Sequence, residues 1–552
     1  MSRGVERNQS QIQSHGAPLL SAFRMLAILS AAFLIWSTAR LELWETSSPE
    51  TDAASSSIPW TKVNPIGVNT FLAREVESWK RERTLEMASE AGAGWIKEHF
   101  PWRDIETAPD TYWDNNFQQD SWAKYDAIVE AAERHGLRVI ARIDLPPGWA
   151  RPTGSDHTSP PANLDDFADF VTDFVDHFRG RVQFIQIWNE PNLAAEWGGE
   201  IDPEGYAELL RVAATAARQA DPNVVILSAP LAMTTENSDR AMDDLSYWRA
   251  LYKAGAEPHF DIMSANAYGL DQKYDAAPDA RTLNIRRIEL IRQIAVEHGD
   301  GDKPIWLNEY GWNASPEGFS PEILTWSRVT EDRQAEWTAD GIEYLTGEHP
   351  WFGVANTWYF RQVGDISIER PDYYFRAVDV EFTPRPLYHA LNELGDRLRY
   401  ARPGVHNDLD AGIRPVGIWS IVRDPGAIQQ EYISGSTGSR LIIQIEGNRL
   451  VGLLSEHQRG TTIVVSTADG SGTGGEELAI ADGQQRIELA SWSVDQAPRA
   501  RTVSVEVVGP QPLLLDGIEV RDGRSSRTLI VGGSALVLAV ACLAILRRNP
   551  TA

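Results

Sequence analysis

The chain has 552 residues, of which 42% are hydrophobic and 23% charged, so it can bury sizeable cores and is not a disordered protein. Its 51 Lys and Arg residues against 78 Asp and Glu residues give a formal net charge of −27. This balance, with no long basic run, argues against a nucleic acid or an anionic surface as partner, because phosphate binding needs clustered positive charge. The single cysteine, Cys542, excludes an intramolecular disulfide and a cysteine-based zinc site.

An uncharged apolar stretch, Met25–Trp36, lies near the N-terminus after three arginines and before Ser37-Thr38-Ala39. Its length and flanks predict a signal peptide or an uncleaved signal anchor, with cleavage left open. We therefore expect residues 1–45 to contain a cytoplasmic tail and this segment. The Ser-rich residues 46–59 are expected to form a linker.

A second apolar segment, Thr528–Leu546, carries no charge and is followed by Arg547 and Arg548. Its length predicts a transmembrane helix at 528–546, with residues 547–552 as a short cytoplasmic tail. Together with the N-terminal export signal, it predicts a cell-membrane protein whose catalytic domain lies on the extracytoplasmic side.

Residues 60–400 alternate short apolar runs with amphipathic stretches. The expected strands are Ile66–Asn69, Trp95–Phe100, Arg138–Ile143, Phe184–Asn189, Val224–Ser228, Asp261–Asn266, Pro304–Asn308 and Gly353–Tyr359. The expected helices include Glu82–Ala91, Ser121–His135, Leu164–Phe178, Pro203–Gln219, Thr282–His298 and Glu331–Leu345. This alternation predicts an α/β fold, a (β/α)8 TIM barrel. A doubly wound open sheet is the alternative, weakened because no glycine-rich loop follows the first strand.

Residues 403–525 have a different pattern, with strand-like runs separated by Gly, Asp and Ser turns and no helical periodicity. The runs are Val416–Val422, Leu441–Glu446, Leu450–Leu454, Thr462–Ser466, Arg486–Ala490, Val503–Val508 and Leu513–Val520. This pattern predicts an all-β sandwich domain. We find no catalytic constellation in it.

Two glutamates end apolar strands in the expected barrel. Glu190 lies in FIQIWNEPN and Glu309 in PIWLNEYGW, each directly after an Asn and beside aromatic residues. The two segments are the fourth and seventh strands, so their C-terminal ends can converge across the mouth of a closed barrel, where active sites of this fold lie.

Paired carboxylates among Trp and Tyr indicate glycoside hydrolysis. One must stay protonated to donate to the leaving oxygen, and the other must be ionised to attack the anomeric carbon. The faces of aromatic rings also match the apolar C–H faces of sugars, and the chain has 20 Trp.

The motifs WNEPN and WLNEYGW resemble the two signatures of clan A glycoside hydrolases, nearest to family 39-like enzymes with family 5 as neighbour. The resemblance covers roughly residues 62–395 and implies a retaining mechanism, with Glu190 as acid/base and Glu309 as nucleophile. It further implies that Asn189 binds the sugar 2-hydroxyl and that Tyr268 holds the nucleophile. Trp358 would form the floor of the subsite at the cleavage point. The β domain resembles galactose-binding-like sandwiches. A structural spacer between barrel and membrane is the favoured role for it, with sugar binding as the alternative, because its surface loops show no obvious aromatic cluster.

The sequence departs from this pattern at two places. Many relatives carry an Arg on an early strand, where this chain offers Lys97, His99 or Arg142. Many carry a His two residues before the strand-six Tyr, where this chain has Asn266. These departures leave the substrate undetermined.

Other residues near strand ends are candidates for substrate binding. Trp102 and Trp149 are expected to line the cleft or to pack under a loop, and His99 to bind sugar or to be a hydrogen-bonded rim residue. Glu98 and Asp144 are assigned to structural ion pairs, and binding of sugar hydroxyls is the alternative role for them. No spacing of His, Asp and Glu suggests a metal, and no cofactor is expected.

The leading hypothesis is therefore a membrane-anchored retaining glycoside hydrolase that cleaves O-glycosidic, β-linked bonds of an oligo- or polysaccharide. The alternatives are a catalytically inactive carbohydrate-binding surface protein and a transglycosylase that uses the same residues.

Overall fold

The computed structural model describes residues 58–522, apart from 321, 365–366, 469–474 and 493–499. The apolar segments at 25–36 and 528–546 lie outside the described residues. In the part of the chain that is described, no helix combines the length and apolar character needed to cross a bilayer.

Eight parallel strands form one sheet in which spatial neighbours follow chain order. The strands are β1 (Ile66–Asn69), β2 (Trp95–Pro101), β5 (Arg138–Asp144), β6 (Phe184–Ile187), β7 (Val225–Leu227), β8 (Met263–Tyr268), β9 (Ile305–Gly311) and β10 (Phe352–Thr357). β10 pairs with β1, and the parallel bridges Leu227–Ile262 and Leu231–Ala265 join β7 to β8. The sheet is therefore closed, which confirms the predicted barrel and excludes the doubly wound alternative.

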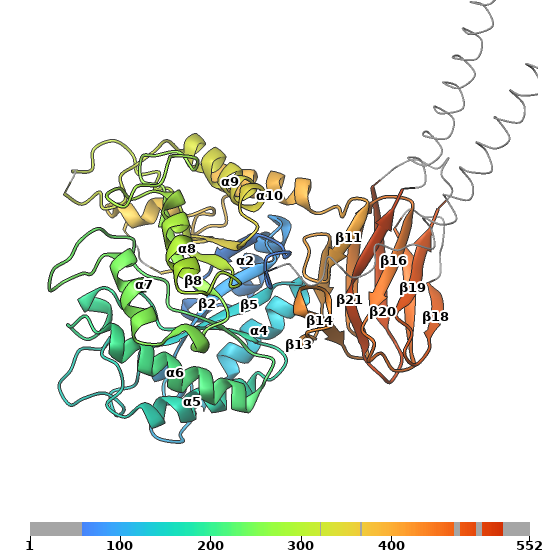
Figure 1. Ribbon diagram of the computed structural model, residues 1–552, viewed down its shortest axis with the longest axis horizontal. Coiled ribbons are helices and arrows are strands. Elements are labelled where there is room, and N and C mark those ends of the chain that lie inside the picture. The colour runs from blue at the N-terminus through green and yellow to red at the C-terminus, as the bar shows by residue number, and fades with distance from the viewer. Residues whose placement is uncertain (1–57, 321, 365–366, 469–474, 493–499, 523–552) are drawn as a thin grey trace, which may run out of the picture. The chain divides into compact units, whose positions relative to one another are not determined.

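One α-helix follows each barrel strand, and these helices lie on the outside of the sheet (Figure 1). They are α2 (Ser78–Glu90), α4 (Ala123–His135), α5 (Leu164–His177), α6 (Pro203–Ala220), α7 (Asp244–Lys253), α8 (Ile288–Glu297), α9 (Glu331–Glu348) and α10 (Pro386–Leu398). The loops carry a short helix α3 (Trp102–Ile105), the strand pair β3 (Trp113–Asp114) and β4 (Gln119–Asp120), and 3₁₀ turns η1 (Leu72–Arg74), η2 (Ala194–Glu196), η3 (Glu257–His259), η4 (Ile285–Arg287) and η5 (Pro371–Phe375).

Local chemistry sets several helix ends. The Asp202 carboxylate accepts the N–H of Gly205 at 2.9 Å, and Pro203 occupies the first position of α6. Gly136 ends α4 with φ of 69°, a left-handed conformation that costs glycine little. These signals are local, and the expected bounds of α4, α5 and α6 differ from the observed ones by at most two residues.

An aromatic layer fills the interior of the barrel near the N-terminal ends of its strands. Trp95, Phe184 and Trp306 have ring centroids 4.8–5.4 Å apart, and Trp60 packs on Phe184 at 5.5 Å. Gly353 makes room for this layer, because a Cβ there would lie 2.0 Å from the Trp306 indole nitrogen. A substrate therefore reaches the interior only from the opposite end, where the strands have their C-termini.

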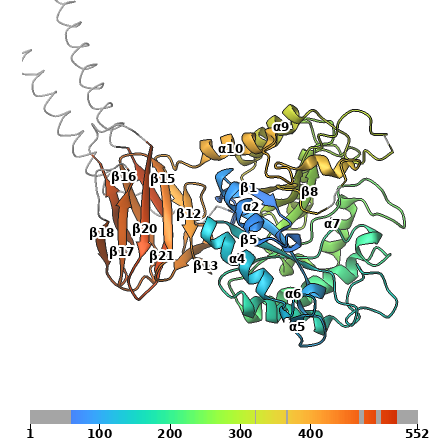
Figure 2. The ribbon, with the colours of Figure 1, turned by 180° about the vertical axis from the view of Figure 1, so that it is seen from behind.

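The C-terminal region forms two antiparallel sheets (Figure 1 and Figure 2). One contains β11 (Gly404–Asn407), β13 (Trp419–Arg423), β14 (Glu431–Gly435), β16 (Arg449–Leu454), β19 (Arg486–Ser491) and β21 (Leu513–Arg521). The other contains β12 (Ile413–Val416), β15 (Arg440–Glu446), β17 (Thr461–Thr467), β18 (Glu476–Ile480) and β20 (Ala500–Val507), and the turn η6 (Ile428–Gln430) precedes β14. Inward residues of both sheets, such as Ile443 and Ile518, share one core. The predicted β-sandwich is thus confirmed.

The sandwich contacts the barrel at residues that precede its strands. The Gln183 side chain, directly before β6, exchanges two hydrogen bonds with the backbone of Ile421 at 2.6 and 2.8 Å. Asp261, before β8, pairs with Arg423 at 2.8 Å. Both contacts lie at the N-terminal ends of strands, so the sandwich leaves the catalytic end of the barrel free.

Candidate active site

Glu190 projects from a strained turn directly after β6. Trp188 and Glu190 both have positive φ, 73° and 43°, which is unusual for residues with a Cβ. The turn is held by the Glu190 N–H, which donates to Pro230 O at 2.9 Å, and by the Trp188 indole, which donates to Glu196 O at 2.9 Å. The strand expected to run to Asn189 therefore ends at Ile187, because Trp188 turns the chain.

Glu309 lies on β9 at the barrel mouth, and the residue is 7% exposed. The Tyr268 hydroxyl on β8 donates to Glu309 Oε2 at 2.6 Å. Lys97 on β2 places its Nζ 3.7 Å from Glu309 Oε1. Both carboxylate oxygens are thereby oriented by groups from other strands.

Asn266 connects the two glutamates. Its Nδ2 donates to Glu190 Oε1 at 2.6 Å, and its Cα pairs in register with that of Glu309. Because Asn266 and Tyr268 are two residues apart on β8, their side chains share one face of the strand. Each holds one glutamate, so the two carboxyl groups converge at the same part of the barrel mouth.

The environment of Glu190 favours its protonated form. Burial, with the nearby charge of Glu309 as the second cause, raises the pKa of Glu190 to about 8. Glu190 therefore carries a proton near neutral pH, while Glu309 receives the Lys97 ammonium and the Tyr268 hydroxyl. This is the arrangement required of an acid and an adjacent ionised nucleophile.

Lys97 occupies the inside of the barrel beside Glu309. It is 3% exposed, and its ammonium also donates to Asn308 O at 3.4 Å. Burial lowers the pKa of Lys97 to about 8, against the opposing attraction of Glu309. Of the three residues offered by the sequence for the missing Arg, Lys97 alone forms an ion pair with Glu309.

Lys97→Gln is expected to lower kcat/KM by about 10- to 100-fold, because the ionised Glu309 loses its paired cation in a buried site. The acidic limb of the pH–activity profile should move to higher pH. Lys253→Gln, a change at the exposed end of α7, is the matched control and should leave both unchanged. An unaltered profile for Lys97→Gln with normal folding would contradict the assigned role.

Asp144 and Glu98, two further acidic residues named from the sequence, have different partners. Asp144 at the end of β5 accepts a hydrogen bond from Arg142 Nε at 2.6 Å and pairs with His99 Nε2. Glu98, assigned beforehand to an ion pair, instead accepts the Thr70 hydroxyl at 2.6 Å and the backbone N–H groups of Leu72 and Ala73.

The tryptophans named from the sequence have different environments. Trp358 is half-buried at the end of β10 and lines a cavity of about 180 Å³ at the barrel mouth. Trp149 is half-buried, and its indole donates to Glu106 O at 3.4 Å. Trp102 is 0% exposed and stacks on Phe170 at 5.3 Å. Trp102 therefore packs in the core under the loop and does not line the cleft.

Asn189 is 5% exposed, and within the described ranges its buried Oδ1 has no hydrogen-bond partner. The turn that carries Glu190 thus also presents an amide beside it. Two further residues at the mouth, Phe71 and Arg74, were missed by sequence reasoning. They belong to the loop after β1, and a basic residue shortly after a strand end was the only signal for them.

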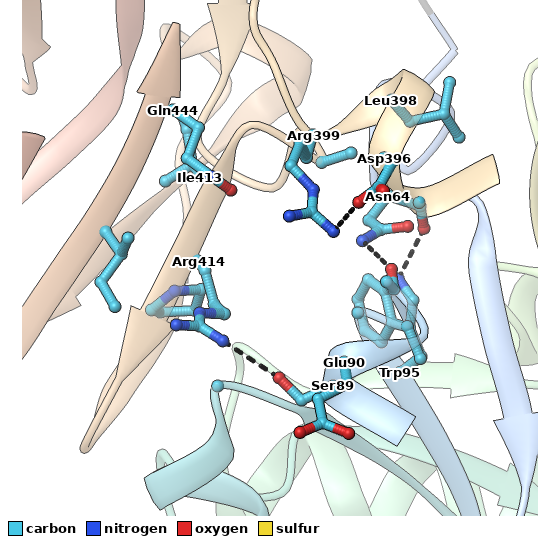
Figure 3. A pocket seen from close by; sticks show the side chains of 18 of the residues that line it. Asn64, Ser89, Glu90, Trp95, Asp396, Leu398, Arg399, Ile413, Arg414 and Gln444 are labelled. Carbon is cyan, nitrogen blue, oxygen red and sulfur yellow. Dashed lines mark hydrogen bonds and ion pairs between the residues drawn. The ribbon is translucent and has the colours of Figure 1, made fainter. Parts of the chain in front are cut away.

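A larger cavity, of about 760 Å³, lies at the other end of the barrel (Figure 3). Its lining includes Asn64 and Trp95 from the barrel and Ile413 and Arg414 from the sandwich, and Arg414 donates to Ser89 Oγ at 3.1 Å. Glu190 and Glu309 do not line it. Because active sites of this fold lie at the C-terminal ends of the strands, we assign this cavity to the junction with the sandwich.

A family model described as cellulase, glycosyl hydrolase family 5, matches residues 56–339. The chain belongs to this family. The match spans seven of the eight barrel strands and both glutamate motifs, and it confirms the predicted resemblance to clan A glycoside hydrolases. This family 5 member is accordingly a glycosidase.

Several solved structures are similar to this family 5 chain. A family 39 glycoside hydrolase from Bacteroides cellulosilyticus WH2 has 16% identity over 81% of each chain and a TM-score of 0.46. A family 39 β-xylosidase from Caulobacter crescentus has 14% identity, covers 82% of this chain and 98% of its own, and has a TM-score of 0.46. An exo-β-1,4-mannosidase from an Opitutaceae bacterium, strain TAV5, has 15% identity over 62% of this chain and 61% of its own, with a TM-score of 0.44. No protein with a curated description matches the sequence.

Proposed function

We propose that this protein is a retaining glycoside hydrolase that cleaves β-linked O-glycosidic bonds by double displacement. One observation carries the proposal: Asn266 and Tyr268, neighbours on one face of β8, hold Glu190 and Glu309 at 2.6 Å each. A protonated carboxyl and an ionised carboxylate then face one anomeric centre.

In the first step, Glu309 attacks the anomeric carbon while Glu190 transfers its proton to the leaving oxygen. This gives a covalent glycosyl ester on Glu309 and an ionised Glu190. In the second step, Glu190 takes a proton from water, the water oxygen attacks the anomeric carbon, and Glu309 leaves as a carboxylate. The released sugar keeps its original anomeric configuration.

The two departures from the family pattern, at Lys97 and Asn266, also bear on the alternative of a catalytically inactive carbohydrate-binding protein. Lys97 supplies a cation next to Glu309 where relatives carry Arg, and Asn266 donates to Glu190 where relatives carry His. The first position thus retains a cation paired with one glutamate, and the second retains a hydrogen-bond donor to the other. This favours a functional enzyme over a binding protein on an inactive barrel.

The proposal also places the enzyme at the cell membrane, with residues 60–522 on the extracytoplasmic side. The support is the sequence alone: the apolar segments 25–36 and 528–546 with their flanking arginines. Fractionation of expressing cells, with protease added to intact cells or spheroplasts, tests it. Resistance of the barrel to the external protease would contradict this orientation.

The purified full-length chain should hydrolyse at least one member of a panel of aryl β-glycosides and β-linked polysaccharides. Proton NMR of the first product formed tests the mechanism, because a retaining enzyme releases the β-anomer before mutarotation. Initial release of the α-anomer would contradict double displacement. Products extended by an added acceptor sugar, in excess over hydrolysis, would indicate the transglycosylase instead.

A further inference from the structure

The 180 Å³ cavity at the barrel mouth is lined by basic side chains from four different segments. We call it the basic pocket and define it by Arg74, Lys97, His99, Arg103 and Arg142. It also contains Trp358, and Lys97 joins it directly to Glu309. The pocket is therefore adjacent to the position of the anomeric centre.

The charges of this pocket are only partly balanced. Lys97 is paired with Glu309, and His99 and Arg142 share the carboxylate of Asp144. Arg103 lies 3.7 Å from the carboxylate of Asp104, which also lines the pocket. Arg74 stacks over the Phe71 ring at 5.2 Å, and no carboxylate of the described residues lies within 4.0 Å of it. One guanidinium at the mouth thus has no protein counterion in the described part of the chain.

Arg74 is held in place by its turn. The buried carboxyl group of Glu98 accepts the N–H groups of Leu72 and Ala73 at 2.9 and 3.1 Å, which anchors η1 to β2. Arg74 is the last residue of this turn. Glu98 is thus a positioning residue, and its oxygens are occupied by the turn and by Thr70.

The cations of the pocket repel one another. Burial lowers the pKa of His99, and the positive charges of Arg142 and Arg74 add to the effect against the attraction of Asp144. The chain as a whole has a net charge of −27, so positive charge at the mouth is a local feature and not a general property of the surface. A bound anion would relieve this repulsion.

We propose that the subsite next to Glu309 takes a sugar with an anionic substituent, recognised by Arg74 and Arg142. A carboxylate or a sulfate presents two oxygens to a guanidinium fork, whereas a hydroxyl accepts single hydrogen bonds. Arg142 uses its Nε for Asp144, which leaves its terminal nitrogens for the ligand. The substrate class is a uronic-acid-containing or sulfated glycan, and this inference rests on the proposed glycosidase function.

Binding to the full-length Glu190→Gln variant tests the inference without turnover. Isothermal titration compares methyl β-glucuronide with methyl β-glucoside, methyl β-galacturonide with methyl β-galactoside, and each neutral glycoside with its 6-sulfate, because these poor leaving groups need the proton that the variant lacks. At least one anionic member should bind about tenfold more tightly than its neutral twin, and the difference should shrink as salt rises. The carboxylate and sulfate pairs separate the two sources of charge. Equal or weaker binding of every anionic member would overturn the inference.

Arg74→Gln in the same background should lower the affinity for the preferred anionic sugar by about tenfold, the loss of one charge-assisted contact. Arg74→Lys should recover part of this loss. Arg211→Gln, on the outer face of α6, is the matched control and should have no effect. Because Arg74 is exposed, its replacement leaves the core intact, which thermal unfolding checks. An anionic preference that is unchanged in Arg74→Gln would also overturn the inference.

The two proposals fail in different ways. Hydrolysis of neutral glycosides by the unmodified enzyme, without an anionic preference, would contradict only the substrate class. Tight anion-dependent sugar binding without hydrolysis by the unmodified enzyme would contradict the glycosidase function.

Discussion

Glu309→Gln is expected to abolish turnover, lowering kcat/KM by at least about 10⁴-fold, because an amide cannot attack the anomeric carbon. The substitution is nearly isosteric, and its carbonyl oxygen can still accept the Tyr268 hydroxyl. The fold should therefore persist, and the loss should reflect chemistry alone. Initial rates on the best aryl glycoside measure the loss of activity, and thermal unfolding measures whether the fold persists.

Covalent trapping identifies the nucleophile directly. A 2-deoxy-2-fluoro aryl glycoside should add one glycosyl group to the unmodified enzyme, and peptide mass spectrometry should locate it on Glu309. Glu208→Gln, an exposed change on α6, serves as the control and should label normally. A label on another residue, or substantial activity in Glu309→Gln, would remove Glu309 from the nucleophile role.

Glu190→Gln is expected to lower kcat/KM by about 10²- to 10⁴-fold for substrates with poor leaving groups. The loss should be smaller for a dinitrophenyl glycoside, whose leaving group needs no proton. This dependence on the leaving group separates an acid catalyst from a residue that only binds substrate. A series of aryl glycosides of graded phenol pKa measures it.

The pH profile supplies a second readout for Glu190. Its raised pKa, about 8, keeps the carboxyl group protonated below that pH, and activity should fall as the pH rises through it. The alkaline limb should disappear in Glu190→Gln, which has no proton to lose. An alkaline limb that remains at the same pH in the variant would assign it to another group, and we would then reject Glu190 as the acid.

The eight strands were predictable from the sequence because strands of a parallel barrel are buried on both faces and appear as short apolar runs. Both catalytic candidates followed from the same signal, since a carboxylate directly after such a run cannot be an ordinary core residue. The helices α7 and α10 were given no bounds from the sequence.

The strand end at Trp188 and the position of Trp102 were predicted wrongly for the same physical reason. Trp188 has an apolar side chain and extends the run of β6, yet its backbone takes a left-handed conformation stabilised by contacts with Ile143 and Glu196. Trp102 follows a strand just as a cleft residue would, yet it stacks on Phe170 of α5. In each case a partner distant in the sequence decides the outcome.

The order of strands and helices, the β-sandwich and the two glutamates at strand ends could all be predicted from the amino-acid sequence, because burial periodicity and strand-end chemistry are local properties. The three-dimensional fold was needed to show that Asn266 and Tyr268 hold these glutamates, that Lys97 pairs with Glu309 and that Arg74 lies at the mouth. These contacts join residues 41 to 212 positions apart, and barrel closure alone brings them within hydrogen-bonding or ion-pair distance.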